Sequence, residues 1–505
     1  MLMTKFNINI YIYLMFIKTQ LVVFINLIAY IYSAISYFSI GALTDTSFMI
    51  KGATPTGDSG SISLFINNNS VATSQPDSSG NFKLVAQNLT SATQYTFDLS
   101  YNNVRLNLNK NINTLPSRGA NFTNNFTITA SSGAKSGSSS GIFTNLLNTT
   151  SNMFFYLGDM FTDSISSNNA NDFTNSYINV LASSSQKNLF QSLPLVYTYN
   201  ELDYGDAAAV RKAYSDFFPT YSLPTTSQGI YQQFYIGSVL VLVTDSRAFI
   251  STDNKTMFGS DQKNWLINSI KAASNDNTVK GIIILFTQEW VYDEKAYSRD
   301  MVKQSKLSYS DSFNSEKQEI ANAIGSINFN NSNGANFKSV LMMSGDARML
   351  AFDNGTNNFY GSFPYLVCGT LDMKGNCYGG PFTHGYFFFE TSQYCKVTIY
   401  QSSNGNVCYF IQGIYNNNNA SQIVLQYDTC RPSAFPGLIN IKCPIMWQEK
   451  LICAAITIGA VLFIFILFYV VFYRIAVYNF NYRVISDDEL IDEKKYEKVK
   501  NEKSE

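Results

Sequence analysis

The chain has 505 residues, which is enough for two or three domains with a large core. Its formal net charge is −1 and only 14% of its residues are charged, so no basic surface indicates a nucleic-acid partner. Its abundance of tyrosine, phenylalanine and small polar residues is typical of a β-rich, glycosylated extracellular protein and argues against a cytosolic helical enzyme.

The N-terminal region predicts a signal peptide over residues 1–36. Lys18 lies before an apolar run, and the tripeptide Ala-Ile-Ser that ends at Ser36 fits a cleavage site. The residues before Met15 are unusual for such a peptide, so Met15 is an alternative start of the chain. An uncleaved signal anchor is the alternative interpretation of this segment.

Residues 37–118 contain short β-like runs. The runs SISLFIN, NFKLVAQ and QYTFDLSY are separated by clusters of turn residues, at the spacing expected for a small β-sandwich. The tetrapeptide PSRG at residues 116–119 is typical of a linker. We therefore predict a separate β-sandwich at this end of the chain.

Residues 119–360 change to apolar strands that alternate with helical patterns. This alternation predicts a layered α/β domain whose sheets are covered by helices. Several of the strands end in an aspartate, at Asp159, Asp245 and Asp346. Because ligands of open α/β sheets bind at the carboxyl ends of the strands, the pattern predicts a strand-end site.

Residues 361–447 return to β-like runs and form a Cys-rich β extension. Six cysteines in one luminal or extracellular region predict three disulfides, with pairing left open: Cys368, Cys377, Cys395, Cys408, Cys430 and Cys443. Nine Asn-x-Ser/Thr sequons agree with the same compartment: Asn68, Asn88, Asn121, Asn125, Asn148, Asn254, Asn330, Asn354 and Asn419.

An uncharged apolar run over residues 451–473 predicts one transmembrane helix. Arg474 follows directly, and residues 474–505 form a charged tail that we expect in the cytosol. Tyr482 begins a Y-x-x-apolar pattern of the kind that directs membrane sorting. The sequence therefore predicts a single-pass type I protein of the cell surface or an endolysosomal vesicle.

Five motifs occur in one order: FYLGDMFTD, LPLVYTYNELDYGD, IGSVLVLVTDSRAF, GSDQKNWL and SVLMMSGDAR. Together they resemble the alkaline phosphatase D (PhoD-like) family of metallophosphatases. The segments LTSATQYTFDLSYNN and INTLPS, which lie upstream, are similar to the fibronectin-type-III-like domain that precedes the catalytic domain in that family. The resemblance covers roughly residues 40–355.

The resemblance implies an α/β layered metallophosphatase-like sandwich that uses bound metal ions to hydrolyse phosphate esters. Four oxygen-bearing residues match or adjoin the metal-binding motifs and are candidate ligands: Asp159, Asn200, Asp203 and Asp346. Oxygen ligands of this kind suit calcium or another hard divalent cation.

This sequence departs from the family pattern at several positions, and Asn200 stands where the first Asp of a Trp-Asp-Asp-His-Asp-like motif is expected. Thr162 stands where a Tyr is common, and Leu202 stands where a His is expected. Ser132 replaces a Cys, and Arg348 replaces the His of a Gly-Asp-x-His motif. His384 is the only histidine and lies outside these motifs, so the usual proton-handling group is missing. Arg348 would compete with a metal, or bind a phosphate or carboxylate directly.

Simpler explanations exist for these residues. Asp159 fits a helix cap, and Asp203-Tyr204-Gly205 fits an ordinary turn. Three functions remain open from the sequence: a degenerate phosphatase fold used for binding, an active phosphomonoesterase or phosphodiesterase that uses oxygen ligands, and a structural or adhesion receptor that acts through its Cys-rich region. The partners expected are a membrane and either a phosphate ester or a protein.

Overall fold

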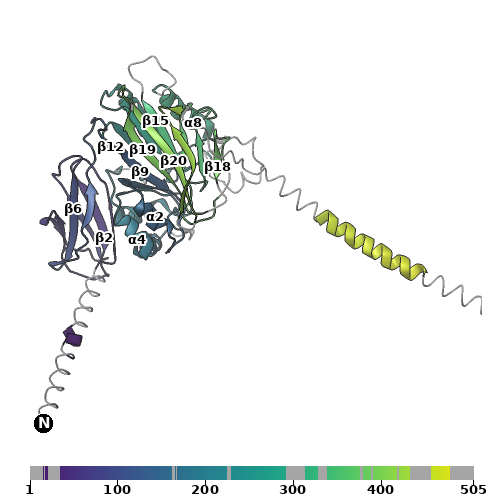
Figure 1. Ribbon diagram of the computed structural model, residues 1–505, viewed down its shortest axis with the longest axis horizontal. Coiled ribbons are helices and arrows are strands. Elements are labelled where there is room, and N and C mark those ends of the chain that lie inside the picture. Colours follow the sequence, from purple (N-terminus) through teal and green to yellow (C-terminus); the bar gives the residue numbers. More distant parts are fainter. Residues whose placement is uncertain are drawn as a thin grey trace, which may run out of the picture. The chain divides into compact units, whose positions relative to one another are not determined.

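The computed structural model describes residues 15, 17–20, 35–161, 165, 168–224, 229–291, 313–327, 338–375, 379–387, 391–417, 420–432 and 457–477. The chain divides into two compact units, Met1–Cys443 and Pro444–Glu505 (Figure 1). Each unit is considered by itself below.

Three sheets form the first unit in the described residues. A nine-stranded sheet has the order β21-β20-β19-β9-β10-β11-β1-β2-β5. Its strands are β1 (Tyr37–Gly41), β2 (Phe48–Ala53), β5 (Asn81–Ala86), β9 (Phe126–Ser131), β10 (Met153–Leu157), β11 (Leu195–Thr198), β19 (Gln393–Gln401), β20 (Val407–Asn417) and β21 (Ala420–Asp428).

A seven-stranded sheet has the order β12-β13-β14-β15-β17-β16-β18, with β12 (Gln232–Ile236), β13 (Val239–Val243), β14 (Gly281–Leu285), β15 (Ser339–Ser344), β16 (Leu350–Asp353), β17 (Tyr365–Val367) and β18 (His384–Phe387). The third sheet contains β3 (Ile62–Ile66), β4 (Asn69–Ser74), β6 (Gln94–Tyr101), β7 (Val104–Arg105) and β8 (Lys110–Asn113). The helices of this unit are α2 (Ile142–Asn148), α3 (Ala170–Ala182), α4 (Ser184–Phe190), α5 (Ala207–Phe217), α6 (Gly259–Asn275) and α8 (Asn314–Gly325).

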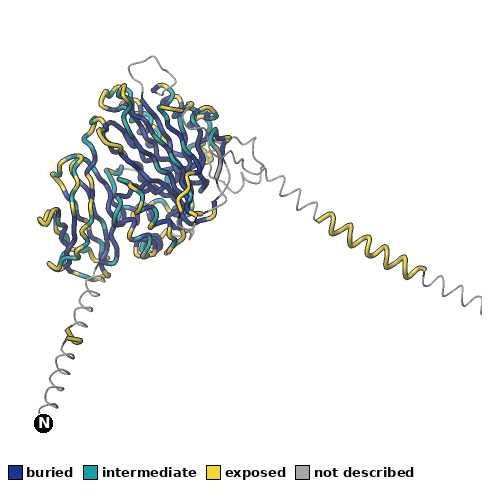
Figure 2. The backbone as a smooth tube through the Cα atoms, viewed as in Figure 1, coloured by how far each residue is buried: buried dark blue, intermediate teal, exposed yellow. Residues whose placement is uncertain are grey.

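The alternation of side chains along the strands explains the layers. In β10, Phe155 and Leu157 pack into the core shared by the two large sheets, whereas Phe154 and Tyr156 pack on the opposite face with residues of α3, α4 and α5. Helices α6 and α8 cover the outer face of the seven-stranded sheet in the same way. Strands buried on both faces are continuously apolar, as the VLVLV of β13 is, and Figure 2 shows them buried. The predicted layered α/β sandwich is therefore present.

The two flanking regions are built into this sandwich instead of standing apart from it. β1 pairs in parallel with β11, so the N-terminal strands β1, β2 and β5 extend the nine-stranded sheet. β19, β20 and β21 extend the same sheet at its other end, and β17 lies inside the seven-stranded sheet. The sequence suggested appended modules because strand pairing between distant segments leaves no local signal. Ile35, which the predicted signal peptide would remove, is also buried in the shared core.

The helix Thr457–Val477 is long and apolar enough to cross a membrane, with a mean hydropathy of 2.5. Its side chains are exposed in the structure, and Figure 2 shows it in the exposed colour. It overlaps the predicted span from Thr457 onward and continues past Arg474 to Val477, while residues 451–456 lie outside the described part. The signal-peptide segment before Ile35 also lies mostly outside the described part.

The cysteines and sequons can be placed in part. Cys408 and Cys430 form a disulfide, while Cys368 and Cys395 are buried free thiols. Cys377 and Cys443 lie outside the described residues, as do the sequons at Asn330 and Asn419. Six of the other sequon asparagines are exposed and one, at position 354, is half-buried: Asn68, Asn88, Asn121, Asn125, Asn148, Asn254 and Asn354.

Candidate functional site

The predicted site lies where five parallel strands end. β10 and β11 are neighbours in the nine-stranded sheet, and β13, β14 and β15 are neighbours in the seven-stranded sheet. Asp159 and Asn200 follow the first pair, and Asp346 follows β15. A side chain at Gly158 would place its Cβ only 2.3 Å from the Cβ of Asn200, and Gly158 has a φ of +91°. Glycine is therefore required for the two strand ends to approach each other.

Arg348 binds Asp159 across the two sheets. Its Nε and Nη2 atoms donate to Oδ2 of Asp159 at 2.8 Å and 2.6 Å. Oδ1 of the same carboxylate accepts from the backbone N–H of Leu202 at 3.3 Å. Burial raises the pKa of Asp159, which is fully buried, and the charge of Arg348 opposes that rise. The sequence predicts that Arg348 either competes with a metal or binds a phosphate or carboxylate. In the structure it binds the carboxylate of Asp159, which is itself a candidate metal ligand.

Asn200 is held by a second arginine. Its Oδ1 atom, the atom that could bind a cation, accepts from Nη2 of Arg247 at 2.6 Å and from Nε2 of Gln288 at 2.7 Å. Its Nδ2 atom donates to Oδ1 of Asp346, which lies 4.0 Å from Nη2 of Arg247. Arg247 follows Asp245 in the Asp-x-Arg motif, and its fully buried guanidinium brings positive charge into the site.

Asp203 joins the loops that follow β10 and β11 through hydrogen bonds. Its Oδ2 accepts from the N–H of Met160 at 2.9 Å and from the hydroxyl of Tyr197 at 2.6 Å, and its Oδ1 accepts from the N–H of Asn200. Burial, and secondarily the charge of Asp159, raise the pKa of Asp203 to about 6. Its carboxylate ties the loop after β10 to the loop after β11, and both of its oxygens already have donors.

Ser132, at the position of the family's cysteine, also bonds to backbone. Its hydroxyl is within hydrogen-bonding distance of the carbonyl oxygens of Gly345 at 2.6 Å and Gly369 at 2.9 Å. A Cβ on Gly345 would come within 2.6 Å of the Cβ of Ser132. The side chain of Ser132 thus fixes the loop after β15 that presents Arg348.

Glu289 was missed by the sequence analysis, although it follows a buried strand as the other site residues do. It is fully buried, and its carboxylate accepts from the hydroxyl of Tyr365 at 2.7 Å and from the N–H of Ala347 at 3.1 Å. Burial raises the pKa of Glu289 to about 8. The position of Glu289 shortly after a buried strand, in the segment IIILFTQEW, is the sequence signal that could have identified it.

The donor set, as arranged, does not fit a divalent cation. The described residues contain no group of three or more His, Cys, Asp or Glu side chains able to hold a metal. Asp159, Asn200 and Asp203 already accept from arginine, amide or backbone donors. Arg247 and Arg348 bring two guanidinium groups to these acceptors. Thr162 lies outside the described residues.

His384 lies away from the strand-end site. It lies in β18, at the edge of the seven-stranded sheet, with its ring 4.9 Å from that of Tyr427 and 5.5 Å from that of Phe352. Its Nδ1 atom contacts the hydroxyl of Thr383 at 2.9 Å, and burial lowers the pKa of His384. The only histidine of the chain therefore packs among aromatic rings and has no part in the site.

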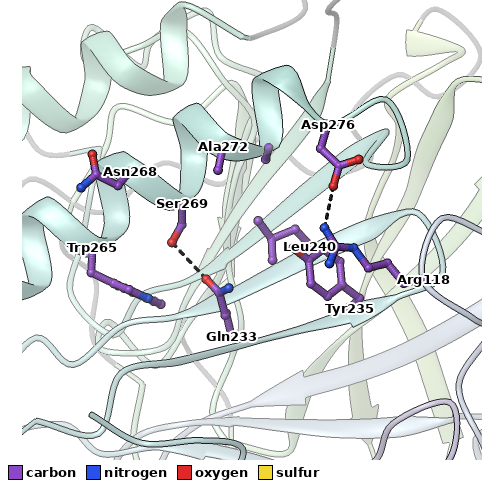
Figure 3. Close-up of a pocket in the computed structure, with 10 residues that line it drawn as sticks. Arg118, Gln233, Tyr235, Leu240, Trp265, Asn268, Ser269, Ala272 and Asp276 are labelled. Atoms are coloured by element: carbon purple, nitrogen blue, oxygen red, sulfur yellow. Dashed lines mark hydrogen bonds and ion pairs between the residues drawn. The ribbon is translucent and has the colours of Figure 1, made fainter. Parts of the chain in front are cut away.

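A separate hollow of about 370 Å³ lies between α6 and β12 (Figure 3). Arg118 lies at one end of it, with its guanidinium 4.2 Å from the ring centre of Tyr235 and 2.7 Å from Oδ2 of Asp276. Trp265 lies at the other end, as Figure 3 shows. None of the lining residues belongs to the strand-end site, so this cavity and the candidate site are different places.

No protein-family model matches the sequence, and no curated protein matches it. Among solved structures, one described as "Structure of PhoD" aligns with a TM-score of 0.58 and 14% identity, over 82% of this chain and 94% of that one. A β-glucuronidase from Parabacteroides merdae aligns with a TM-score of only 0.19 and 7% identity, over 77% of this chain and 68% of its own, and carries no argument. The chain therefore has a PhoD-like fold, as its ordered motifs predict.

Proposed function

We propose that this chain is a single-pass type I membrane glycoprotein whose PhoD-like ectodomain has lost metal-dependent phosphatase activity and serves in binding. The ectodomain would face the cell exterior or the lumen of an endolysosomal vesicle. The exposed apolar helix Thr457–Val477, the Cys408–Cys430 disulfide and the exposed sequons support this placement. We also propose that β1 to β8 are a fibronectin-type-III-like sandwich, because they divide between two facing sheets that share a core.

The ion pair between Asp159 and Arg348 carries the loss-of-activity proposal. Both residues stand at positions where the resemblance implies metal ligands, and here they bind each other with two charge-assisted hydrogen bonds. A cation that bound Asp159 would have to displace a guanidinium from a buried carboxylate. The exchange would leave Arg348 without its charge partner beside the cation, which costs free energy. Arg348 thus neutralises the charge of the Asp159 carboxylate without a metal ion.

Hydrolysis assays test the proposal directly. Full-length protein, purified in detergent, is assayed with an aryl phosphate monoester and a diester in the presence of calcium, magnesium, manganese, zinc or iron. We expect the wild type to be no faster than the Asp159→Ala variant, with Asp253→Ala as a matched control at an exposed carboxylate. Metal-dependent hydrolysis that survives Asp253→Ala and disappears in Asp159→Ala would establish the active phosphatase instead.

A further inference from the structure

The two free thiols lie against each other between the large sheets. Cys368 directly follows β17 of the seven-stranded sheet, and Cys395 lies in β19 of the nine-stranded sheet. Both are fully buried in the shared core, and their side chains are in hydrogen-bonding contact. The sulfur of Cys395 is also 3.6 Å from the carbonyl oxygen of Val367. Two thiols from different sheets therefore contact each other inside the buried core.

Two backbone hydrogen bonds hold the segments that carry these cysteines together. The N–H of Gln393 donates to the carbonyl of Thr370 at 2.7 Å, and a second bond of the same direction follows one residue further along each segment. These two bonds hold the segment that follows Cys368 against the segment that precedes Cys395. A disulfide needs its two Cα atoms about 4.4–6.8 Å apart. The sulfur of Cys395 already lies 3.6 Å from the carbonyl oxygen of Val367, the residue before Cys368.

The first unit already contains one disulfide, at the end of the antiparallel pair β20 and β21. Phe410 pairs with Asp428 in the register of β20 and β21, and extending that register by two residues brings Cys408 opposite Cys430. These two cysteines are bonded, with their Cα atoms 5.6 Å apart. This bond is the reference for the pair proposed below.

We propose that Cys368 and Cys395 form a cross-strand disulfide that links the two large sheets. The bond forms during folding, when the thiols are accessible to a disulfide-donating thiol oxidoreductase. The two S–H bonds break and one S–S bond forms, and two electrons and two protons pass to the donor, whose disulfide becomes a dithiol. The bond fixes Gly369, whose carbonyl lies within hydrogen-bonding distance of the Ser132 hydroxyl, and so anchors the loops of the strand-end site.

Peptide mapping tests the pairing on the native protein. Full-length chain is purified without reductant, alkylated, digested and analysed by mass spectrometry, with the Cys408–Cys430 bond as the internal positive control. We expect a linked peptide pair that contains Cys368 and Cys395 and lacks two hydrogen atoms relative to the free thiols. The proposal is overturned if both cysteines are alkylated while the control remains linked, or if either is linked to another cysteine.

A stability measurement tests the same bond independently. In a Cys408→Ser/Cys430→Ser background, a strong reductant should lower the thermal midpoint of unfolding, because the remaining cross-link restricts the unfolded chain. Adding Cys395→Ser to that background should remove most of this reductant effect. Cys377 and Cys443 are the same in both backgrounds, so the difference belongs to the proposed pair. An equal response of the two backgrounds would contradict the proposal.

Discussion

Arg348 and Asp159 join the two large sheets at the ends of their parallel strands. Both Nε and Nη2 of Arg348 donate to one oxygen of Asp159, which follows β10, while Arg348 follows β15. Both residues have a positive φ, of +57° for Asp159 and +52° for Arg348. Such conformations are costly for residues other than glycine and persist where the surroundings hold them. The surrounding structure therefore holds both residues in the backbone conformations in which they form this ion pair.

Removing the arginine should destabilise the protein strongly. Arg348→Ala leaves the buried carboxylate of Asp159 without its charge partner, which costs roughly 3–5 kcal/mol of unfolding free energy. Adding Asp159→Asn removes the uncompensated charge and should restore a large part of that loss. Denaturant titration of the single and double variants in detergent measures both effects.

The exposed pair Arg118–Asp276 is the control for this experiment. It joins the same residue types, but 56% of the Arg118 side chain is exposed. Arg118→Ala should therefore cost at most about 1 kcal/mol. Equal losses in Arg348→Ala and Arg118→Ala would refute the assignment of Arg348 as the counter-charge of a buried carboxylate.

The buried carboxyl of Glu289 should make stability fall as pH rises. Burial raises the pKa of Glu289 from 4.5 to about 8, so the folded chain retains a proton between these pH values that the unfolded chain releases. The unfolded state then binds fewer protons, and the free energy of unfolding decreases with rising pH by up to about 1.4 kcal/mol per pH unit. Asp203, whose pKa is raised to about 6, adds to this decrease at lower pH.

Glu289→Gln should flatten that dependence, since the glutamine is neutral throughout. Unfolding free energies measured from pH 5 to 8 should show a smaller slope in this variant than in the wild type. Glu319→Gln, at a half-exposed position paired with Lys263, should leave the slope unchanged. An unchanged slope in Glu289→Gln would show that Glu289 is ionised in the folded protein.

The close approach of β10 and β11 can be tested at Gly158. In Gly158→Ala the new Cβ would lie 2.3 Å from the Cβ of Asn200, and the φ of +91° adds strain. We expect a loss of about 1–3 kcal/mol from steric crowding in addition to the backbone cost. Gly137→Ala shares a positive φ of +65° but meets no atom within 4 Å, so it measures the backbone cost alone. Equal losses in the two variants would show that the strand ends are further apart.

The proposed topology predicts glycans on one side of the membrane only. Asn88 is exposed in a left-handed turn before β6, so an oligosaccharyltransferase could reach it in the lumen. Asn88→Gln should remove one glycan-dependent shift in electrophoretic mobility, while a tag placed after Glu505 should stay accessible only from the cytosol. A protected C-terminal tag, or no glycan on any sequon, would contradict the type I orientation.

The sequence predicted the sandwich and the strand-end position of the site because both depend on local patterns. Alternating apolar strands and helices, and aspartates directly after buried strands, are visible in single segments such as FYLGDMFTD. The pairing of Asp159 with Arg348 was not visible, because it joins two sheets and depends on the packing between them. The pairing of β19 with β9 likewise joins segments far apart in the chain and leaves no signal in either strand alone.

The metal content of the full-length protein tests the central claim most directly. The protein is purified without chelator, equilibrated with calcium, magnesium, manganese, zinc and iron salts, freed of unbound ions and analysed by elemental mass spectrometry. Because Arg348 satisfies Asp159, we predict no metal above the level found in the Asp159→Ala variant. About one or more metal ions per chain in the wild type, lost in Asp159→Ala and retained in Asp253→Ala, would contradict the account.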